Sequence, residues 1–304
     1  MSASGEVSLE VTCADGVRLG GTLLLPPAGV ERLGVVQFNP GTAAPARFYR
    51  RFLTYLASRG FAVASYDNRG TGRSRPAGTL ADCDYRYLDY GTLDAPAVLE
   101  WLRARFPGEP LLVLGHSAGG QQFCLLPPEA YAGVRGALFF AVSTGYLPGL
   151  AAYYRPQAWA FWRVLGPVLI RRYGYGAFSR LGLMEDLPAG VYYDWRRWCG
   201  SPDYFFGAGF GDSRNSAGDP LPAPAWSAMD FPIRHVHAPT DEISSRRNVA
   251  TFWRNWHPAG GVEQVVLDPA GTGGRPIRHF DYFRPRFEQT AWAEAAAWLA
   301  ARCA

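Results

Sequence analysis

The sequence predicts an α/β protein with a mostly parallel β-sheet that helices cover on both faces. Short apolar runs alternate with longer segments of helical periodicity, which is typical of parallel strands joined by helices. A hairpin precedes this alternation, and an aromatic-rich segment interrupts it. A chain of 304 residues, 48% of them hydrophobic, is long enough for one large domain that carries an insert.

The first predicted element is a hairpin with strands at 6–13 and 17–25, and it would add an antiparallel edge to the sheet. The other predicted strands are short apolar runs, as expected of strands buried on both faces; they span 33–38, 61–66, 110–114, 136–142, 233–237 and 262–267. Hydrophobic residues at helical spacing predict helices over 47–58, 93–106, 245–256 and 290–302, and the strand at 110–114 is followed by a segment that can open a further helix.

Residues 145–228 break the alternation and are expected to form an inserted, helical cap or lid over a core domain made of 1–144 and 229–304. Eighteen of the 84 residues of the insert are aromatic, about 21%, against 14% for the whole chain. Helical periodicity covers 151–172, with a kink expected at Pro167.

The aromatic rings of the insert have two expected roles. Most of them would form the insert's own core. Others, such as Trp159 and Trp162, would line an apolar substrate pocket beneath the cap. Docking of this segment on a membrane surface is an alternative, because Arg171 and Arg172 flank an apolar stretch.

The pentapeptide Gly115-His116-Ser117-Ala118-Gly119 fits the G-x-S-x-G pattern of a nucleophile elbow. An apolar strand precedes it and a potential helix follows it, which is the context that the pattern requires. Such a tight reversal forces the serine into a strained backbone conformation, for which the flanking glycines leave room. Ser117 is therefore the expected nucleophile, at the end of the sheet, and His116 is expected to point away from the serine's partner.

A serine hydroxyl needs a base within hydrogen-bond reach, and the base needs an orienting acid. Of the five histidines, His279 lies between the last predicted strand and the last predicted helix, so it would return to the sheet edge that carries Ser117. Asp241 follows the penultimate strand and is the expected acid. Glu242 beside it and Asp268 after the last strand remain alternatives.

Two further expectations concern donors and metals. The tetrahedral intermediate of acyl transfer needs an oxyanion hole, for which the backbone N–H of Ala118 is one expected donor. The second should come from the loop after the strand at 33–38, where Thr42 is the first candidate and Ala43 the next.

The pair His235 and His237 has no third ligand at suitable spacing, so we expect no metal site.

Composition excludes several classes of function. The net charge is only +4, and all 30 basic residues are arginine, which argues against a nucleic-acid surface and removes every mechanism that needs a lysine. The glycine-rich turn at 67–74 lacks the lysine of a phosphate-binding loop and is expected to be structural. Neither a signal peptide nor a run of about 18 apolar residues is present, and five scattered cysteines suggest no disulfide framework, so we expect a cytoplasmic protein.

Five segments of the chain resemble the α/β-hydrolases, and more closely their serine-aminopeptidase and monoglyceride-lipase-like branch. They are Pro40–Tyr49, Tyr66–Ser74, Gly115–Gly120, Thr240–Glu242 and Arg278–Pro285, and they span nearly the whole chain in the expected order. The resemblance implies an α/β-hydrolase fold with a cap at 145–228, a Ser117-His279-Asp241 triad, and an oxyanion hole at Thr42 and Ala118.

Two positions depart from the pattern of this family. Pro40 replaces the usual histidine of the oxyanion loop, and Arg278 replaces the usual glycine before the catalytic histidine. Arg278 would place a large cation beside the base, and Pro40 would alter the geometry of the oxyanion donors.

These observations together predict a serine hydrolase that cleaves carboxylic esters, with an apolar acyl or aryl group, through an acyl-enzyme. Its partner would be a small-molecule ester or acyl substrate, and the chemistry requires no metal or organic cofactor. The same triad would serve an acyltransferase or a thioesterase, because one fold supports many reactions. A non-catalytic ligand-binding protein on a hydrolase fold is the remaining alternative.

Overall fold

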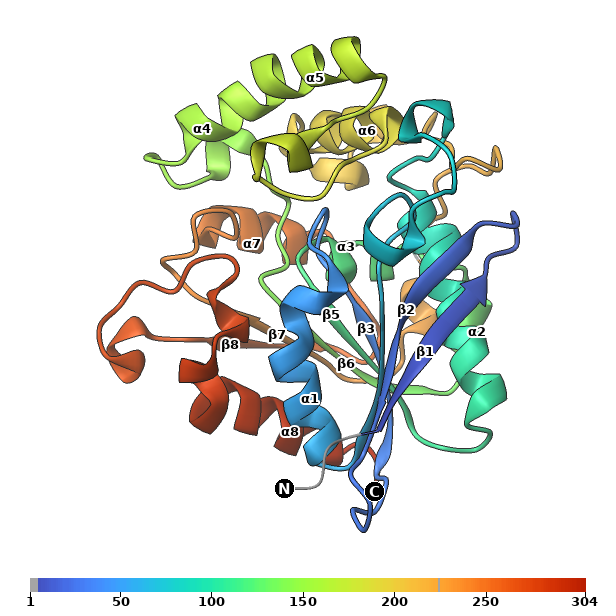
Figure 1. The fold of residues 1–304 in the computed structure, drawn as a ribbon. Coiled ribbons are helices and arrows are strands. Elements are labelled where there is room, and N and C mark those ends of the chain that lie inside the picture. Colours follow the sequence, from blue (N-terminus) through green and yellow to red (C-terminus); the bar gives the residue numbers. More distant parts are fainter. Residues whose placement is uncertain (1–4, 224) are drawn as a thin grey trace.

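The computed structural model describes residues 5–223 and 225–304, and an eight-stranded sheet forms its centre (Figure 1). The strands are β1 (Gly5–Thr12), β2 (Arg18–Leu25), β3 (Gly34–Asn39), β4 (Phe61–Tyr66), β5 (Leu111–His116), β6 (Val134–Phe140), β7 (Ile233–His237) and β8 (Val262–Val266). They lie in the order β1-β2-β4-β3-β5-β6-β7-β8. The hairpin β1–β2 is antiparallel and joins the sheet antiparallel to β4, whereas β3 to β8 are parallel to one another. The predicted parallel sheet with an antiparallel edge is confirmed.

Helices cover both faces of the sheet, since its central strands are apolar on both sides. These helices are α1 (Arg50–Ser58), α2 (Ala95–Arg105), α3 (Ala118–Phe123), α7 (Arg246–Arg254) and α8 (Ala293–Ala300). In β5, Leu112 and Leu114 pack into the core that α1 and α8 cover, whereas Val113 packs into the core that α2, α3 and α7 cover. A strand buried in this way has no polar face, which explains its continuous apolar sequence.

Three further helices lie above the carboxyl edge of the sheet (Figure 1). They are α4 (Arg155–Ala160), α5 (Gly166–Tyr173) and α6 (Ala189–Cys199). The sequence suggested that most aromatic rings of this region form a core of their own. The structure shows otherwise. Trp162, Trp198 and Tyr204 belong to the same buried cluster as Val113 of the sheet, so one continuous core joins the upper helices to one face of the sheet.

A turn of π-helix, Phe161–Leu165, joins α4 to α5 just before Pro167. Because Pro167 has no N–H, it cannot donate to the carbonyl of Trp162. The single O–H of Tyr192, on α6, is instead shared between the carbonyls of Phe161 and Trp162, each 2.9 Å from the hydroxyl oxygen. A Cβ at Gly166 would lie 2.1 Å from the Tyr192 ring, so a glycine is needed for the two helices to approach this closely. The disturbance expected at Pro167 thus takes the form of this irregular turn.

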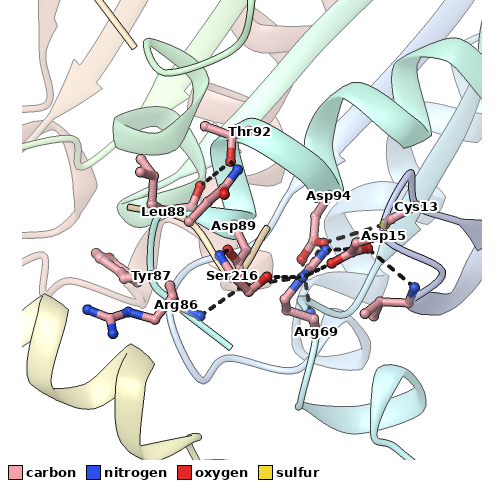
Figure 2. A network of polar contacts seen from close by, with 12 residues as sticks. Cys13, Asp15, Arg69, Arg86, Tyr87, Leu88, Asp89, Thr92, Asp94 and Ser216 are labelled. Atoms are coloured by element: carbon pink, nitrogen blue, oxygen red, sulfur yellow. Dashed lines mark hydrogen bonds and ion pairs between the residues drawn. The ribbon is translucent and has the colours of Figure 1, made fainter. Parts of the chain in front are cut away.

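A buried ionic cluster joins distant parts of the chain (Figure 2). Arg69 is fully buried and lies 2.7 Å from Asp94, 2.6 Å from Asp15 and 3.2 Å from Asp89. Asp89 also accepts the backbone N–H of Ser216 at 2.7 Å, which fixes the loop around Ser216 to the core. The turn that contains Arg69 is therefore structural, as predicted.

Both ends of the described chain lie at the amino edge of the sheet, on the side away from α4–α6 (Figure 1). Gly5 of β1 pairs with Leu25, and Cys303 lies beside Gly34 where β3 begins. Within residues 5–223 and 225–304, no helix has the length and hydropathy needed to cross a bilayer.

Candidate active site

Ser117 stands in a sharp turn between β5 and α3, at φ 51° and ψ −115°. Only a few per cent of non-glycine residues adopt a positive φ, and they are concentrated in tight turns and functional sites. Gly119 permits the turn, because a Cβ there would lie 2.1 Å from the carbonyl oxygen of Asn39. The backbone therefore has the strand–turn–helix geometry that the pentapeptide predicts.

The structure brings Ser117, His279 and Asp241 into one hydrogen-bonded chain. Nε2 of His279 lies 3.0 Å from Oγ of Ser117. Nδ1 of His279 lies 3.0 and 3.1 Å from the two carboxylate oxygens of Asp241. Since a carboxylate only accepts, Nδ1 carries the hydrogen and Nε2 is left to accept from the serine hydroxyl. His279 and Asp241 are buried, and Ser117 is half-buried.

Asp241 is held by groups besides His279. Its Oδ1 accepts the backbone N–H groups of Ile243 and Ser244 at 2.9 and 2.8 Å. Its Oδ2 accepts the hydroxyl of Tyr282 at 3.0 Å, and this hydroxyl in turn accepts the N–H of Ala238 at 3.0 Å. The sequence reasoning missed Tyr282, although it lies in the segment Arg278–Pro285 that carries the family resemblance.

The two alternative acids occupy other places. The carboxylate of Glu242 faces the backbone N–H of His279 at 3.4 Å and makes no recorded contact with the imidazole ring. Asp268 caps a short helical turn by accepting the N–H of Ala270 at 2.9 Å. Of the three candidates, Asp241 is the one whose carboxylate meets the histidine ring.

The site shifts the pKa values of its two ionisable members in opposite directions. Burial alone would lower the pKa of His279, but the adjacent Asp241 carboxylate outweighs burial and raises this pKa above its usual value. Burial opposes the ionised form of Asp241, yet His279 and the two backbone N–H groups hold the pKa of this carboxyl below its usual value. The pair thus favours an ionised carboxylate beside an imidazole whose pKa is raised.

His116 does not point away from the base as expected. Its Nε2 lies 2.9 Å from the carbonyl oxygen of His279 and must donate to it, and its Nδ1 lies 2.9 Å from the hydroxyl of Tyr49. That hydroxyl also accepts the N–H of Gly41 at 3.1 Å. The buried imidazole therefore links the loop of Gly41 to the loop of His279, and burial holds its pKa well below the usual value.

The candidate oxyanion donors come from two separate segments, the loop after β3 and the start of α3. Thr42 lines the cavity next to Ser117, and its hydroxyl is 2.8 Å from that of Tyr87. Ala118 follows Ser117 as the first residue of α3. Among the described residues, neither the N–H of Thr42 nor that of Ala118 has a hydrogen-bond acceptor. Neither Ala43, the second choice for the loop donor, nor Ala118 is among the residues whose atoms line the cavity.

The paired histidines of β7 serve the core. His235 accepts the N–H of Val142 at 3.0 Å through Nε2, contacts Gln264 at 2.7 Å through Nδ1, and stacks on His237 with ring centroids 5.0 Å apart. No group of three or more potential metal ligands was found within residues 5–223 and 225–304.

Comparisons with known proteins show what the chain is similar to. A model of the family described as serine aminopeptidase S33 matches residues 31–173, just under half of the chain, which include the loop of Thr42 and the turn of Ser117. The chain has the fold of an α/β-hydrolase, and the matched part is similar to this branch. A comparison with curated protein sequences found no match.

The hydrolase also resembles solved structures over nearly its whole length. A soluble variant of the monoglyceride lipase of Saccharomyces cerevisiae, solved with a substrate analogue, is 16% identical with a TM-score of 0.66, over 99% of this chain and 96% of that one. An esterase of Pyrococcus furiosus is 16% identical with a TM-score of 0.60, over 99% and 92%. The esterase domain of a Rhodothermus marinus protein is 15% identical with a TM-score of 0.57, over 99% and 100%. At these identities, the likeness shows a common fold.

A cavity of about 260 Å³ opens beside Ser117 and His279 of the hydrolase. Its walls are mostly apolar, and they include Leu150, Phe161, Trp162, Met184, Trp195 and Phe280. Gln121 is one of the few polar groups, and its Oε1 accepts the hydroxyl of Tyr204 at 2.9 Å.

Two expectations about large side chains near the site need correction. Trp162 lines the cavity of Ser117, but Trp159 does not; it lines a neighbouring cavity instead. Arg278 does not lie against the imidazole, since it is exposed and its Nη1 is 3.3 Å from the hydroxyl of Tyr153. The cation that departs from the family pattern therefore faces outward.

Proposed function

We propose that this hydrolase cleaves carboxylic esters by a Ser117-His279-Asp241 triad, through an acyl-enzyme. The observation that carries the proposal is the continuous hydrogen-bonded chain from the serine hydroxyl through the imidazole to the buried carboxylate. A chain of this kind activates a serine that is otherwise a poor nucleophile at neutral pH.

In the proposed reaction, Oγ of Ser117 attacks the ester carbonyl while Nε2 of His279 takes its proton. His279 then gives this proton to the leaving alcohol, and the acyl group stays on Ser117. Water attacks the acyl-enzyme by the same steps and releases the acid. Asp241 orients the imidazole and stabilises its protonated form throughout.

The N–H groups of Thr42 and Ala118 are the proposed oxyanion donors. Their lack of other acceptors, the place of Thr42 in the cavity wall and the place of Ala118 directly after Ser117 support this role. Donors of this kind lower the barrier because they are already aimed at the charge that develops in the transition state.

The apolar cavity supports a substrate with an apolar acyl or aryl group. A volume of about 260 Å³ holds roughly nine groups of water size, at about 30 Å³ each, so acyl chains of short to medium length fit best.

We propose that 145–228 acts as a cap over the core formed by 1–144 and 229–304. Phe161, Trp162 and Trp195 of this cap form part of the cavity wall. All five cysteines are free, which supports the expected cytoplasmic location.

The test is hydrolysis of p-nitrophenyl esters from acetyl to long acyl chains by the wild type and Ser117→Ala. We expect activity with a maximum at short to medium chains, and its loss in the variant. Labelling by a fluorophosphonate, measured in parallel, reports an activated Ser117 independently of the substrate.

The remaining outcomes separate the alternatives. Labelling of Ser117 without hydrolysis of any ester would favour an acyltransferase or a thioesterase. Folded protein with neither labelling nor hydrolysis would overturn the proposal and favour a ligand-binding protein.

A further inference from the structure

A second cavity lies beside the one that contains Ser117. It has a volume of about 550 Å³ and is bounded by the segment 146–148, by α4 with the π-turn that follows it, and by α6 with the two residues after it. Trp162 and Cys199 line both cavities. Because both side chains are buried, they form the wall that the two cavities share.

Three arginines and no carboxylate line the second cavity. Arg197 is engaged, since it donates to Asp212 at 2.8 Å. Arg163 and Arg196 have no carboxylate partner among the residues that the structure describes. Both of these side chains line the same cavity. Two cations that lack an acidic partner and line one cavity create a field that attracts an anion.

The fold fixes these two arginines from different helices. Arg163 lies in the π-turn Phe161–Leu165, and Arg196 lies on α6. The Tyr192 hydroxyl joins these elements through the carbonyls of the π-turn. At this turn Trp162 is buried while Arg163 is exposed towards the cavity. Turns of π-helix occur frequently at functional sites.

Exposed aromatic rings border the same cavity. Trp159 is 53% exposed and Tyr193 is 42% exposed. Large rings that remain open to solvent beside guanidinium groups offer flat apolar surfaces next to a positive charge. Such a surface suits a ligand with an organic part and an anionic end.

We propose that this cavity binds an anionic oxygen group, a carboxylate or a phosphate, through Arg163 and Arg196. The guanidinium fork matches the oxygens of either group, and the rings of Trp159 and Tyr193 contact the organic part of the ligand. The anion belongs either to the acyl substrate, whose chain would then have to pass around Trp162 and Cys199, or to a separate small molecule. The site itself does not depend on the proposed hydrolysis.

The first experiment measures binding without catalysis. Phenyl phosphate is the probe, with neutral benzamide as the control ligand, and isothermal titration calorimetry gives the dissociation constant. We expect saturable binding of phenyl phosphate that inorganic phosphate displaces from the wild type. Binding should weaken about tenfold or more in the double variant Arg163→Gln/Arg196→Gln.

The matched control is Arg171→Gln/Arg172→Gln, which removes the same charge from exposed positions of α5. It should bind phenyl phosphate like the wild type. Three outcomes would overturn the proposal. The two double variants could bind phenyl phosphate equally well, or the wild type could bind benzamide as tightly as phenyl phosphate. The wild type could also show no saturable binding of phenyl phosphate. The displacement by inorganic phosphate needs no variant, so it tests the site even if a variant fails to fold.

A second experiment identifies the source of the anion. It compares mono-p-nitrophenyl suberate with its methyl-capped ester, which lacks the charge. If the anion belongs to the substrate, the Arg163/Arg196 variant raises KM for the charged ester about tenfold and leaves that of the capped ester unchanged. If the anion is a separate molecule, neither KM changes while phenyl phosphate binding still falls. If the wild type itself hydrolyses neither ester, the result counts against the proposed function, and the phenyl phosphate binding result still stands.

Discussion

Asp241 governs the protonation of His279, since its carboxylate raises a pKa that burial alone would lower. In the proposed mechanism the neutral imidazole is the base, so we expect kcat/KM of the wild type to rise with pH through a pKa above the usual 6.5 of histidine. In Asp241→Asn the pKa of His279 should fall, because burial lowers it and the negative charge of the carboxylate no longer raises it. The variant should also lose about 10⁴-fold in kcat. The measurement is a pH–rate profile of both proteins with one p-nitrophenyl ester, and an unchanged acid limb would contradict this role of Asp241.

Tyr282 is the second residue whose role can be isolated, because its hydroxyl joins the Asp241 carboxylate to the N–H of Ala238. Tyr282→Phe removes that hydroxyl alone. A charge-assisted hydrogen bond of this kind is worth about 1.5–3 kcal/mol, so we expect kcat to fall roughly tenfold or more with little change in KM.

The matched control for this variant is Tyr131→Phe. Tyr131 is also buried, and its hydroxyl donates to the carbonyl of Phe123, outside the site. We expect Tyr131→Phe to lower the free energy of unfolding about as much as Tyr282→Phe does, and to leave kcat unchanged. If both variants lower kcat equally, Tyr282 has no specific effect on the triad.

Single residues of the site differ in how far the sequence reveals them. Ser117 lies in a short motif, and Asp241 and His279 lie after identifiable strands, so chain order was enough to predict them. Tyr282 and His116 act through partners that only the folded chain supplies, such as Ala238, 44 residues from Tyr282. No local spacing encodes such a contact.

At the scale of elements, the contact between α6 and the α4–α5 pair depends on Gly166. Alanine is the better helix former by about 1 kcal/mol, but its Cβ would lie 2.1 Å from the Tyr192 ring. We expect Gly166→Ala to destabilise the protein by roughly 1–3 kcal/mol, as overpacking does. Chemical denaturation measures the effect, and Gly209→Ala is the control because a Cβ at Gly209 meets nothing within 4 Å. If the two variants have the same free energy of unfolding, α6 can move to make room for the added methyl group without loss of stability.

The elements themselves differ in how predictable they are. The strand predicted at 61–66 coincides with β4, because its boundaries are set by Gly60 and by the polar residue Asp67. The π-turn before Pro167 was not predictable in form. Proline signals a lost N–H, but which group satisfies the orphaned carbonyl depends on Tyr192 of another helix. The shared core of the upper helices and the sheet likewise arises from packing across segments far apart in the sequence.

For the whole molecule, the cluster around Arg69 links stability to pH. Burial raises the pKa of Asp89 from 3.8 to about 6. The folded state then holds more protons than the unfolded state between about pH 4 and 6, so this group makes the free energy of unfolding fall as pH rises through that window. The effect is on the order of 3 kcal/mol. Asp89→Asn should remove it.

The measurement is urea unfolding at pH 4.5, 5.5 and 7 for the wild type and for Asp89→Asn. The difference in free energy between the two proteins should shrink, or change sign, as pH increases. Asp84→Asn, an exposed aspartate five residues away, serves as the control and should follow the wild type. A constant difference across this range would show that Asp89 is ionised at every pH tested.

The position of the chain ends has a practical consequence. Gly5 and Cys303 lie at the amino edge of the sheet, and Ser117 follows β5 at the opposite edge. A tag, a fusion partner or an attachment to a solid support at either of these ends would therefore lie away from Ser117. Because the chain has no lysine, amine-directed attachment would reach only the terminal amino group and would give one uniform orientation.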